Sequence, residues 1–124
     1  MTPEEIEARR AEAKAWDLKV ANLASDHLRH LQQDGRPPVF VFFGTRIEQQ
    51  RFWRAMVGIL SPLRVPLPAL EDVIPAAPSR LRGTRRRLIP VHQSYPWLPG
   101  RREAADAADA AHLIDALNRS NGWA

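Results

Sequence analysis

Arginines are concentrated in one short stretch of this 124-residue chain, around the pair Gly83-Thr84. A guanidinium is planar, always charged and able to form paired hydrogen bonds with phosphate or carboxylate. A row of them can follow the phosphates of a nucleic acid, or meet an acidic groove on another protein. The stretch has no acid of its own, so we expect its side chains to be exposed and unpaired by the protein's own carboxylates. Its members are Arg80, Arg82, Arg85, Arg86 and Arg87.

A second group of arginines follows the turn Phe43-Gly44-Thr45-Arg46. A strand that leads into the start of a helix presents unpaired backbone N–H groups, which form a generic anion site. Arg51 and Arg54 lie on the non-apolar side of the helix that would follow. We therefore count Arg46, Arg51 and Arg54 as candidate phosphate or partner ligands. The same turn is where a small enzyme would hold an anionic substrate.

The other chemistry-bearing residues give no catalytic or metal signature. The chain has no cysteine, which excludes disulfides and thiolate metal sites. His27 and His30 lie on or beside an apolar helix stripe and are interpreted as packing residues. His92-Gln93-Ser94 is a single copy of a pattern that a two-histidine phosphoesterase would need twice. We predict no catalytic residue, no bound metal and no cofactor.

Two aromatic residues lie in the proline-braced segment Tyr95-Pro96-Trp97-Leu98-Pro99. Rigid aromatic side chains lose little entropy on binding and make good interface anchors. They are equally suited to covering a core beneath a loop. Tyr95 and Trp97 are therefore candidate interface anchors, with core covering as the alternative.

Charge is unevenly distributed along the chain. Residues 35–102 carry a net charge of +9, between acidic ends of −2 (residues 1–34) and −3 (residues 103–124). Either the ends neutralise the middle inside the fold, or part of the middle faces an anionic partner. The second alternative predicts nucleic acid, or an acidic or nucleoprotein surface, as the partner.

The N-terminal third of the sequence predicts one long helix over residues 3–33. Thr2 is a suitable N-cap, and Gly35 followed by Pro37-Pro38 ends the helix. An apolar stripe runs along it, and the first two turns, mostly charged or alanine, are expected to extend from the body. The stripe is suited to burial in the chain's own core or to pairing in a homodimer. Its members are Ile6, Ala13, Trp16, Val20, Leu23, Ala24, His27, Leu28 and Leu31.

The next segment predicts a strand–turn–helix unit. Residues 39–43 form an apolar run typical of a buried strand, and Thr45 with Glu48 matches a capping box for a helix over residues 46–60. We expect the apolar face of that helix to be buried against Val39, Val41 and the first helix. The residues of this face are Trp53, Met56, Val57 and Leu60.

The last part of the chain combines a proline-rich middle with a final helix. Residues 62–100 contain eight of the eleven prolines, which favours irregular chain, with a β-hairpin formed by Ser79–Arg82 and Arg86–Val91. Residues 102–118 predict an alanine-rich helix with Leu113, Ile114 and Leu117 on one face. The fold class is therefore α+β, in a single small domain over residues 1–124.

These features favour a small non-enzymatic binding or regulatory protein that docks its basic surface on nucleic acid or on an acidic or nucleoprotein partner. An accessory factor or inhibitor from a phage or mobile element fits this profile. The alternatives are an assembly subunit associating through the N-terminal helix, and a small enzyme acting on an anionic substrate. The acidic N-terminus does not resemble a secretory signal, and the longest apolar run is too short to span a bilayer. We therefore expect a cytoplasmic protein without a membrane partner.

Overall fold

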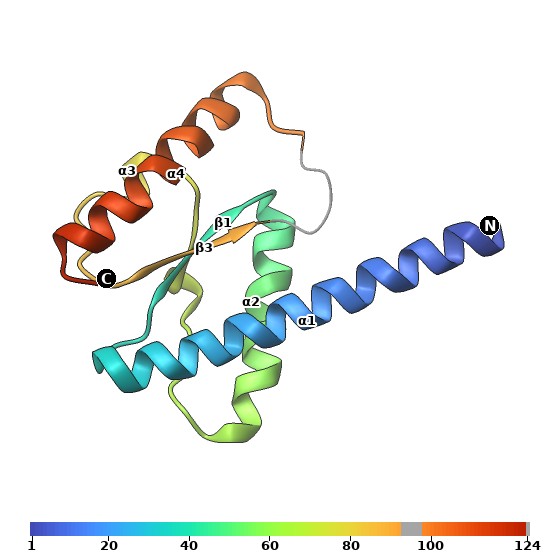
Figure 1. Cartoon of the computed structure of the whole chain (residues 1–124), viewed down its shortest axis with the longest axis horizontal. Coiled ribbons are helices and arrows are strands. Elements are labelled where there is room, and N and C mark those ends of the chain that lie inside the picture. The colour runs from blue at the N-terminus through green and yellow to red at the C-terminus, as the bar shows by residue number, and fades with distance from the viewer. Residues whose placement is uncertain (93–97, 124) are drawn as a thin grey trace.

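The structure is a computed structural model that describes residues 1–92 and 98–123. It has the α+β composition that the sequence predicts, with helices packed around one small sheet (Figure 1). In chain order the elements are α1 (Pro3–Asp34), β1 (Val39–Phe43), α2 (Arg46–Leu60), 3-10 turns at Ser61–Leu63 and Leu70–Asp72, β2 (Val73–Pro75), α3 (Pro78–Leu81), β3 (Leu88–His92) and α4 (Arg101–Ser120).

The ends of α1 are fixed by local hydrogen bonds. Thr2 Oγ1 accepts from Glu5 N at 3.2 Å, and the Glu5 carboxylate accepts from Thr2 N at 3.2 Å, which completes a capping box. At the other end Gly35 has φ of 70° and donates its N–H to Leu31 O. Glycine adopts this left-handed conformation without strain, so the helix ends where the sequence predicts.

The sheet consists of three parallel strands in the order β2-β1-β3. β1 is the central strand, and all five of its residues are buried. A strand covered on both faces has no polar side, which is why its sequence is an unbroken apolar run instead of an alternating one.

One face of the sheet packs against α1 and α2. Phe40 and Phe42 point to this side, and their rings contact the Phe52 ring at centroid distances of 5.6 and 5.7 Å. Met56 and Leu60 are fully buried here, as predicted, whereas Trp53 and Val57 are only half-buried.

The opposite face packs against α3 and α4. Val39 and Val41 lie on this side with Leu81 and Ile114, so the prediction that they pack against α2 is wrong. The reason is the alternation of side chains along a strand, which sends neighbours to opposite faces of the sheet. A continuous apolar run carries no information on which residues face which helix. The partly buried Leu113 and Leu117 confirm the predicted apolar face of α4.

The predicted β-hairpin is wrong. Residues Pro78–Leu81 form the short helix α3, and β3 pairs with β1 in parallel instead of returning along a neighbour in sequence. Pro78 occupies the first turn of α3, a position where proline is favoured because its missing N–H needs no partner. β2 was not expected in the proline-rich region.

In both edge strands of the sheet, a proline and side-chain hydrogen bonds leave little backbone free to pair with a further strand. Each edge strand carries a proline, Pro75 in β2 and Pro90 in β3, which has no N–H to offer a further strand. Side-chain amides bond to the backbone of both strands. Gln49 Nε2 donates to Val73 O at 2.7 Å, and the Asn118 amide binds both the N–H and the C=O of Leu88. The sheet therefore offers little free backbone to another strand.

None of the helices within residues 1–92 and 98–123 is long and apolar enough to cross a membrane.

Candidate functional site

Two of the candidate arginines line an open groove at the carboxyl ends of β1 and β2. It has a volume of about 460 Å³ and lies between the start of α2, the end of β2 and α3. Gly44 follows β1 and Arg46 is the first residue of α2, while Arg80 comes from α3. In sheets of parallel strands, ligands bind outside these carboxyl ends, where loops and helix N-termini converge. The groove thus unites two arginines that are far apart in the sequence.

The groove is electropositive. Arg46 and Arg80 are exposed, and neither forms an ion pair with another described residue. The N-terminus of α2 adds partial positive charge, and Gln50 supplies an amide on the same rim. Glu71 is the one carboxylate among the lining residues. Two forked donors across a groove of this size fit an oxyanion such as phosphate or carboxylate.

The arginines of α2 do not all face this groove. Arg54 is exposed, but it lies about 80° further round the helix than Arg46 and does not line the groove. Arg51 instead lines a separate pocket between α1 and α2, with Trp16 and Asp17. Of the three α2 candidates, Arg46 alone therefore lines this groove.

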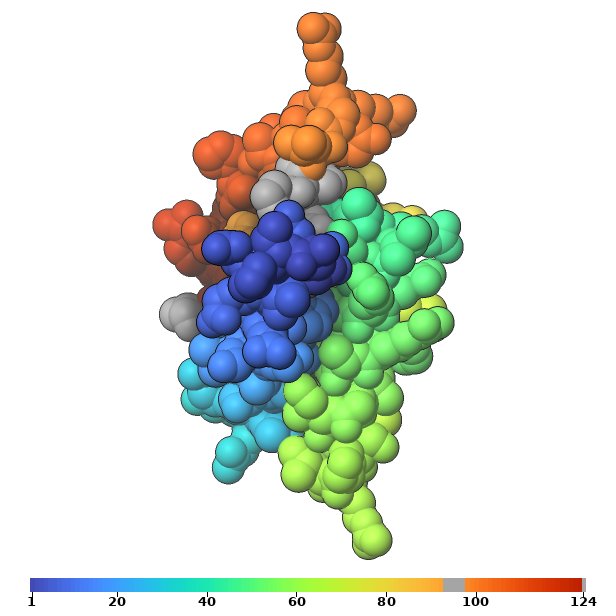
Figure 2. Space-filling model, turned by 90° about the vertical axis from the view of Figure 1, so that its right-hand side faces the viewer, coloured from blue at the N-terminus to red at the C-terminus, as the bar shows by residue number. Residues whose placement is uncertain are grey.

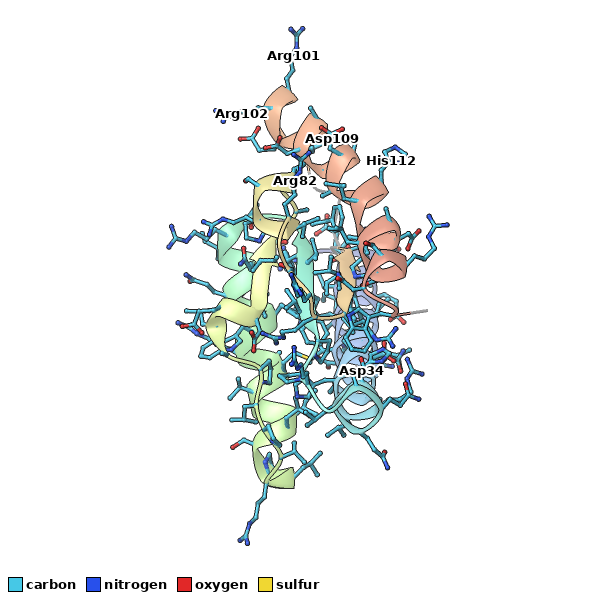
Figure 3. All side chains as sticks on the ribbon, turned by 90° about the vertical axis from the view of Figure 1, so that its left-hand side faces the viewer. Asp34, Arg82, Arg101, Arg102, Asp109 and His112 are labelled. Atoms are coloured by element: carbon cyan, nitrogen blue, oxygen red, sulfur yellow. The ribbon has the colours of Figure 1, made fainter. Side chains whose placement is uncertain are left out.

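Three arginines of the basic stretch are exposed, as predicted. They are Arg80, Arg82 and Arg85, and none of them forms an ion pair within the described part of the chain. Arg82 follows α3 directly, at the side of the molecule where α3 packs on α4 (Figure 3). These residues stay available to a partner.

Arg86 contradicts the prediction of an unpaired side chain. Its Nη1 donates to Asp72 Oδ1 at 2.7 Å, and its Nε donates to Pro37 O at 2.8 Å. A longer bond runs to Pro38 O at 3.3 Å. The guanidinium thereby ties the start of β2 to the chain that enters β1. Arg86 is a structural residue, because its donors already have partners inside the fold.

Arg87 is also internal, contrary to the prediction. Its guanidinium pairs with Asp34 at the end of α1, at 2.9 Å from Nε and 3.3 Å from Nη2, and only 15% of its side-chain surface is exposed. Its other face lies 5.5 Å from the centre of the Trp123 ring. Part of the positive middle is thus neutralised by the acidic N-terminal segment, the alternative that the charge distribution left open.

The C-terminal end of α4 holds the segment that carries these arginines. Asn121 Nδ2 donates to Thr84 O at 3.0 Å, and Trp123 Nε1 donates to Arg85 O at 2.8 Å. Together with the Asn118 bonds to Leu88, they fix the backbone of residues 84–88. Asparagine is common near the end of a helix, and nothing in the sequence indicated these side-chain bonds.

Two exposed arginines were missed as site candidates. Arg101 and Arg102 begin α4, and Figure 3 shows Arg101 projecting from the end of the helix. Gly100, the N-cap residue, makes no side-chain capping bond. Positive charge at a helix N-terminus opposes the helix dipole, so two arginines there are locally unfavourable. This unfavourable placement is the feature by which the sequence could have indicated Arg101 and Arg102 as site candidates, because locally unfavourable residues are concentrated at functional sites.

Three further sequence expectations have mixed outcomes. Thr45 Oγ1 accepts from Glu48 N at 3.3 Å, but Glu48 Oε2 is buried and has no hydrogen-bond partner in the described chain, so only half of the capping box forms. His27 and His30 are buried packing residues as predicted, and His27 Nε2 donates to Pro66 O. Tyr95 and Trp97 lie outside the described residues.

Burial lowers the pKa of His30, and the nearby Arg87 and Arg29 lower it further, whereas Asp34 and Asp26 act in the opposite direction. Burial likewise lowers the pKa of Lys19. No group of three histidine, aspartate or glutamate side chains within the described residues is arranged to hold a metal ion.

Comparison with known proteins gives no relative. No protein-family model, curated protein or solved structure is significantly similar to this chain.

Proposed function

We propose that this chain is a small binding protein that docks on the phosphate backbone of a nucleic acid through its exposed arginines. The observation that carries the proposal is the groove in which Arg46 and Arg80 converge, exposed and without an ion-pair partner in the described chain. Arg54, Arg82 and Arg85 are further exposed arginines outside the groove. A partner with regularly spaced negative charges satisfies a set of separated guanidiniums better than one small anion does.

The test is binding to labelled duplex DNA, duplex RNA and single strands, measured by fluorescence anisotropy over a series of salt concentrations. The double variant Arg46→Ala/Arg80→Ala should bind more weakly to all sequences alike. Its slope of log affinity against log salt should be shallower by roughly 0.9 per lost phosphate contact. The matched control is Arg9→Ala/Arg10→Ala, which removes the same charge from exposed positions on α1.

Equal losses of affinity in the two double variants would show that the groove is not the binding site and that binding depends only on the net charge of the protein. Absence of binding to every nucleic acid at low salt would reject the proposal itself. A polyglutamate peptide included in the same series then distinguishes an acidic protein partner, which should depend on the same two arginines.

A single small anion is the second candidate ligand, and the position of the groove favours it. Inorganic phosphate is the probe, added to the same anisotropy assay as a competitor. Competition well beyond the effect of an equal ionic strength of chloride would favour the small anion.

A further inference from the structure

The first half of α1 is a helix without a packing partner in the described chain. Residues 1–15 are all exposed, and this part of α1 extends beyond the body of the molecule (Figure 1). Figure 2 looks onto its N-terminal end. From Pro3 to Ala15 it spans about 20 Å, at a rise of 1.5 Å per residue. A helix of that length is only marginally stable in water by itself, so packing against another element would stabilise it.

Four exposed apolar residues form a stripe along this helix, which we call the α1 stripe. They are Ala8, Ala11, Ala15 and Leu18, separated by three, four and three residues, which is the spacing of the a and d positions of a coiled coil. Leu18 has 64% of its surface exposed. The stripe lies apart from the residues that α1 buries in the core, such as Val20 and Ala24.

We propose that the α1 stripe packs antiparallel against the same stripe of a second copy of this chain. With Ala11 opposite Ala15 of the second copy, Leu18 meets Ala8 at both ends. The small side chain leaves room for the large one, so the pattern is complementary to itself in this orientation. A parallel pairing would instead oppose Leu18 to Leu18 and leave three layers of alanine alone.

The surface beside the α1 stripe has room for the second helix. The surface next to Ala8 and Ala11 is formed by α1 alone and is open, and a groove of about 410 Å³ lies next to Ala15 and Leu18. This groove continues to Pro90 of β3. The antiparallel register lays Leu18 of one copy against Ala8 on the open surface of the other, and the first turns of α1 along the groove of the other.

Charge complementarity between the two copies favours the antiparallel orientation. The first turns of α1 are acidic, with Glu4 and Glu5, and the groove that receives them contains Lys19 as its cation, together with Asp26, which is already paired with Arg29. In the proposed register Glu5 lies opposite Lys19 of the other copy.

A parallel pairing would place Glu7 against Glu12 and Lys14 against Lys19. The antiparallel register still brings Glu12 near Glu12 of the second copy, and Lys14 near Lys14 of the second copy, at the two-fold axis. The interface has four layers, two of them formed by alanine alone and two by one leucine against one alanine. For both reasons the dimer should be weak and concentration-dependent.

The register is tested by cross-linking, since the chain has no cysteine of its own. Under mild oxidation, a mixture of Ala11→Cys and Ala15→Cys chains should form disulfide-linked dimers about tenfold faster than either variant alone. Equal rates in the mixture and in the separate variants would overturn the proposal. Faster cross-linking of either variant alone would show a parallel pairing and overturn it as well.

The surface is tested by sedimentation velocity over a concentration series. The unaltered chain should show a dimer fraction that rises with concentration, and Ala11→Glu should abolish it. Ala13→Glu is the matched control, because position 13 is exposed on the same helix but points about 200° away from position 11. A strict monomer for the unaltered chain, or equal losses in the two variants, would overturn the proposal.

Discussion

Arg85 and Arg86 are neighbours in the sequence, but their side chains have different environments. Arg85 is exposed, whereas Arg86 pairs with Asp72, whose side chain is 12% exposed. Removing one member of such a pair leaves the other charged and poorly solvated. Position in the sequence therefore does not decide the role: Arg86 joins the segment before β1 to the segment before β2, and Arg85 does not.

We predict that Arg86→Ala lowers the free energy of unfolding by about 2–4 kcal/mol, since it leaves Asp72 Oδ1 and two backbone carbonyls without the hydrogen bonds that Arg86 donates. Arg85→Ala should change it by less than about 0.5 kcal/mol. Urea denaturation of the two variants measures both values. Equal stabilities would contradict the structural role of Arg86.

His30 should make the stability depend on pH. Its pKa is lower in the folded state than in the unfolded chain, so below about pH 6.5 the unfolded state binds more protons. Stability is therefore complete above that pH and falls as the pH drops toward 5, by at most about 1.4 kcal/mol per pH unit. Urea denaturation at a series of pH values should show this loss in the unaltered chain and a smaller one in His30→Gln. An identical pH dependence in the variant would show that another group is responsible.

At the scale of elements, the long helices were predictable and the strand pairing was not. α1 and α2 have the bounds the sequence predicts to within one residue, because Thr2, Gly35 and Thr45 mark their ends by local chemistry. β2 and β3 depend on pairing with β1, which is distant in the sequence. A strand at residues 86–91 was predicted, but as part of a hairpin, whereas β2 was missed because its proline argued against a strand, although proline is compatible with an edge strand.

Some features of the candidate site could be predicted from the sequence, and others could not. Exposure of Arg80, Arg82 and Arg85 followed from the lack of nearby acids, and the structure confirms it. The pairing of Arg86 and Arg87 could not be predicted, because Asp72 and Asp34 come beside them only through the fold. The convergence of Arg46 with Arg80 likewise requires the parallel sheet.

Asn118 should be the most sensitive polar residue of α4. We predict that Asn118→Ala costs about 2–4 kcal/mol, because it leaves both the N–H and the C=O of Leu88 without a partner, and Leu88 is 2% exposed. Asn121→Ala removes one bond, to the half-buried Thr84, and should cost about 1 kcal/mol. Thermal denaturation ranks the two variants. The reverse order would show that the Asn118 amide does not hold the edge of β3.

At the scale of the whole molecule, the basic and acidic parts of the chain are partly matched inside the fold. Arg87 meets Asp34 of the acidic N-terminal segment, while Arg101 and Arg102 remain exposed at the opposite end of α4 from the Asn118 contacts. Fewer arginines are therefore exposed and without an ion pair in the described chain than the sequence predicts.

The central place of β1 has a consequence during synthesis. Its apolar run leaves the ribosome well before both neighbours, since Leu88 follows Phe43 by 45 residues. At translation rates of roughly 5–20 residues per second, that interval is roughly 2–9 s. During it, α1 and α2 can cover Phe40 and Phe42. The side with Val39 and Val41 must wait for α3 and α4, so the nascent chain exposes half of a strand that is fully enclosed in the finished protein.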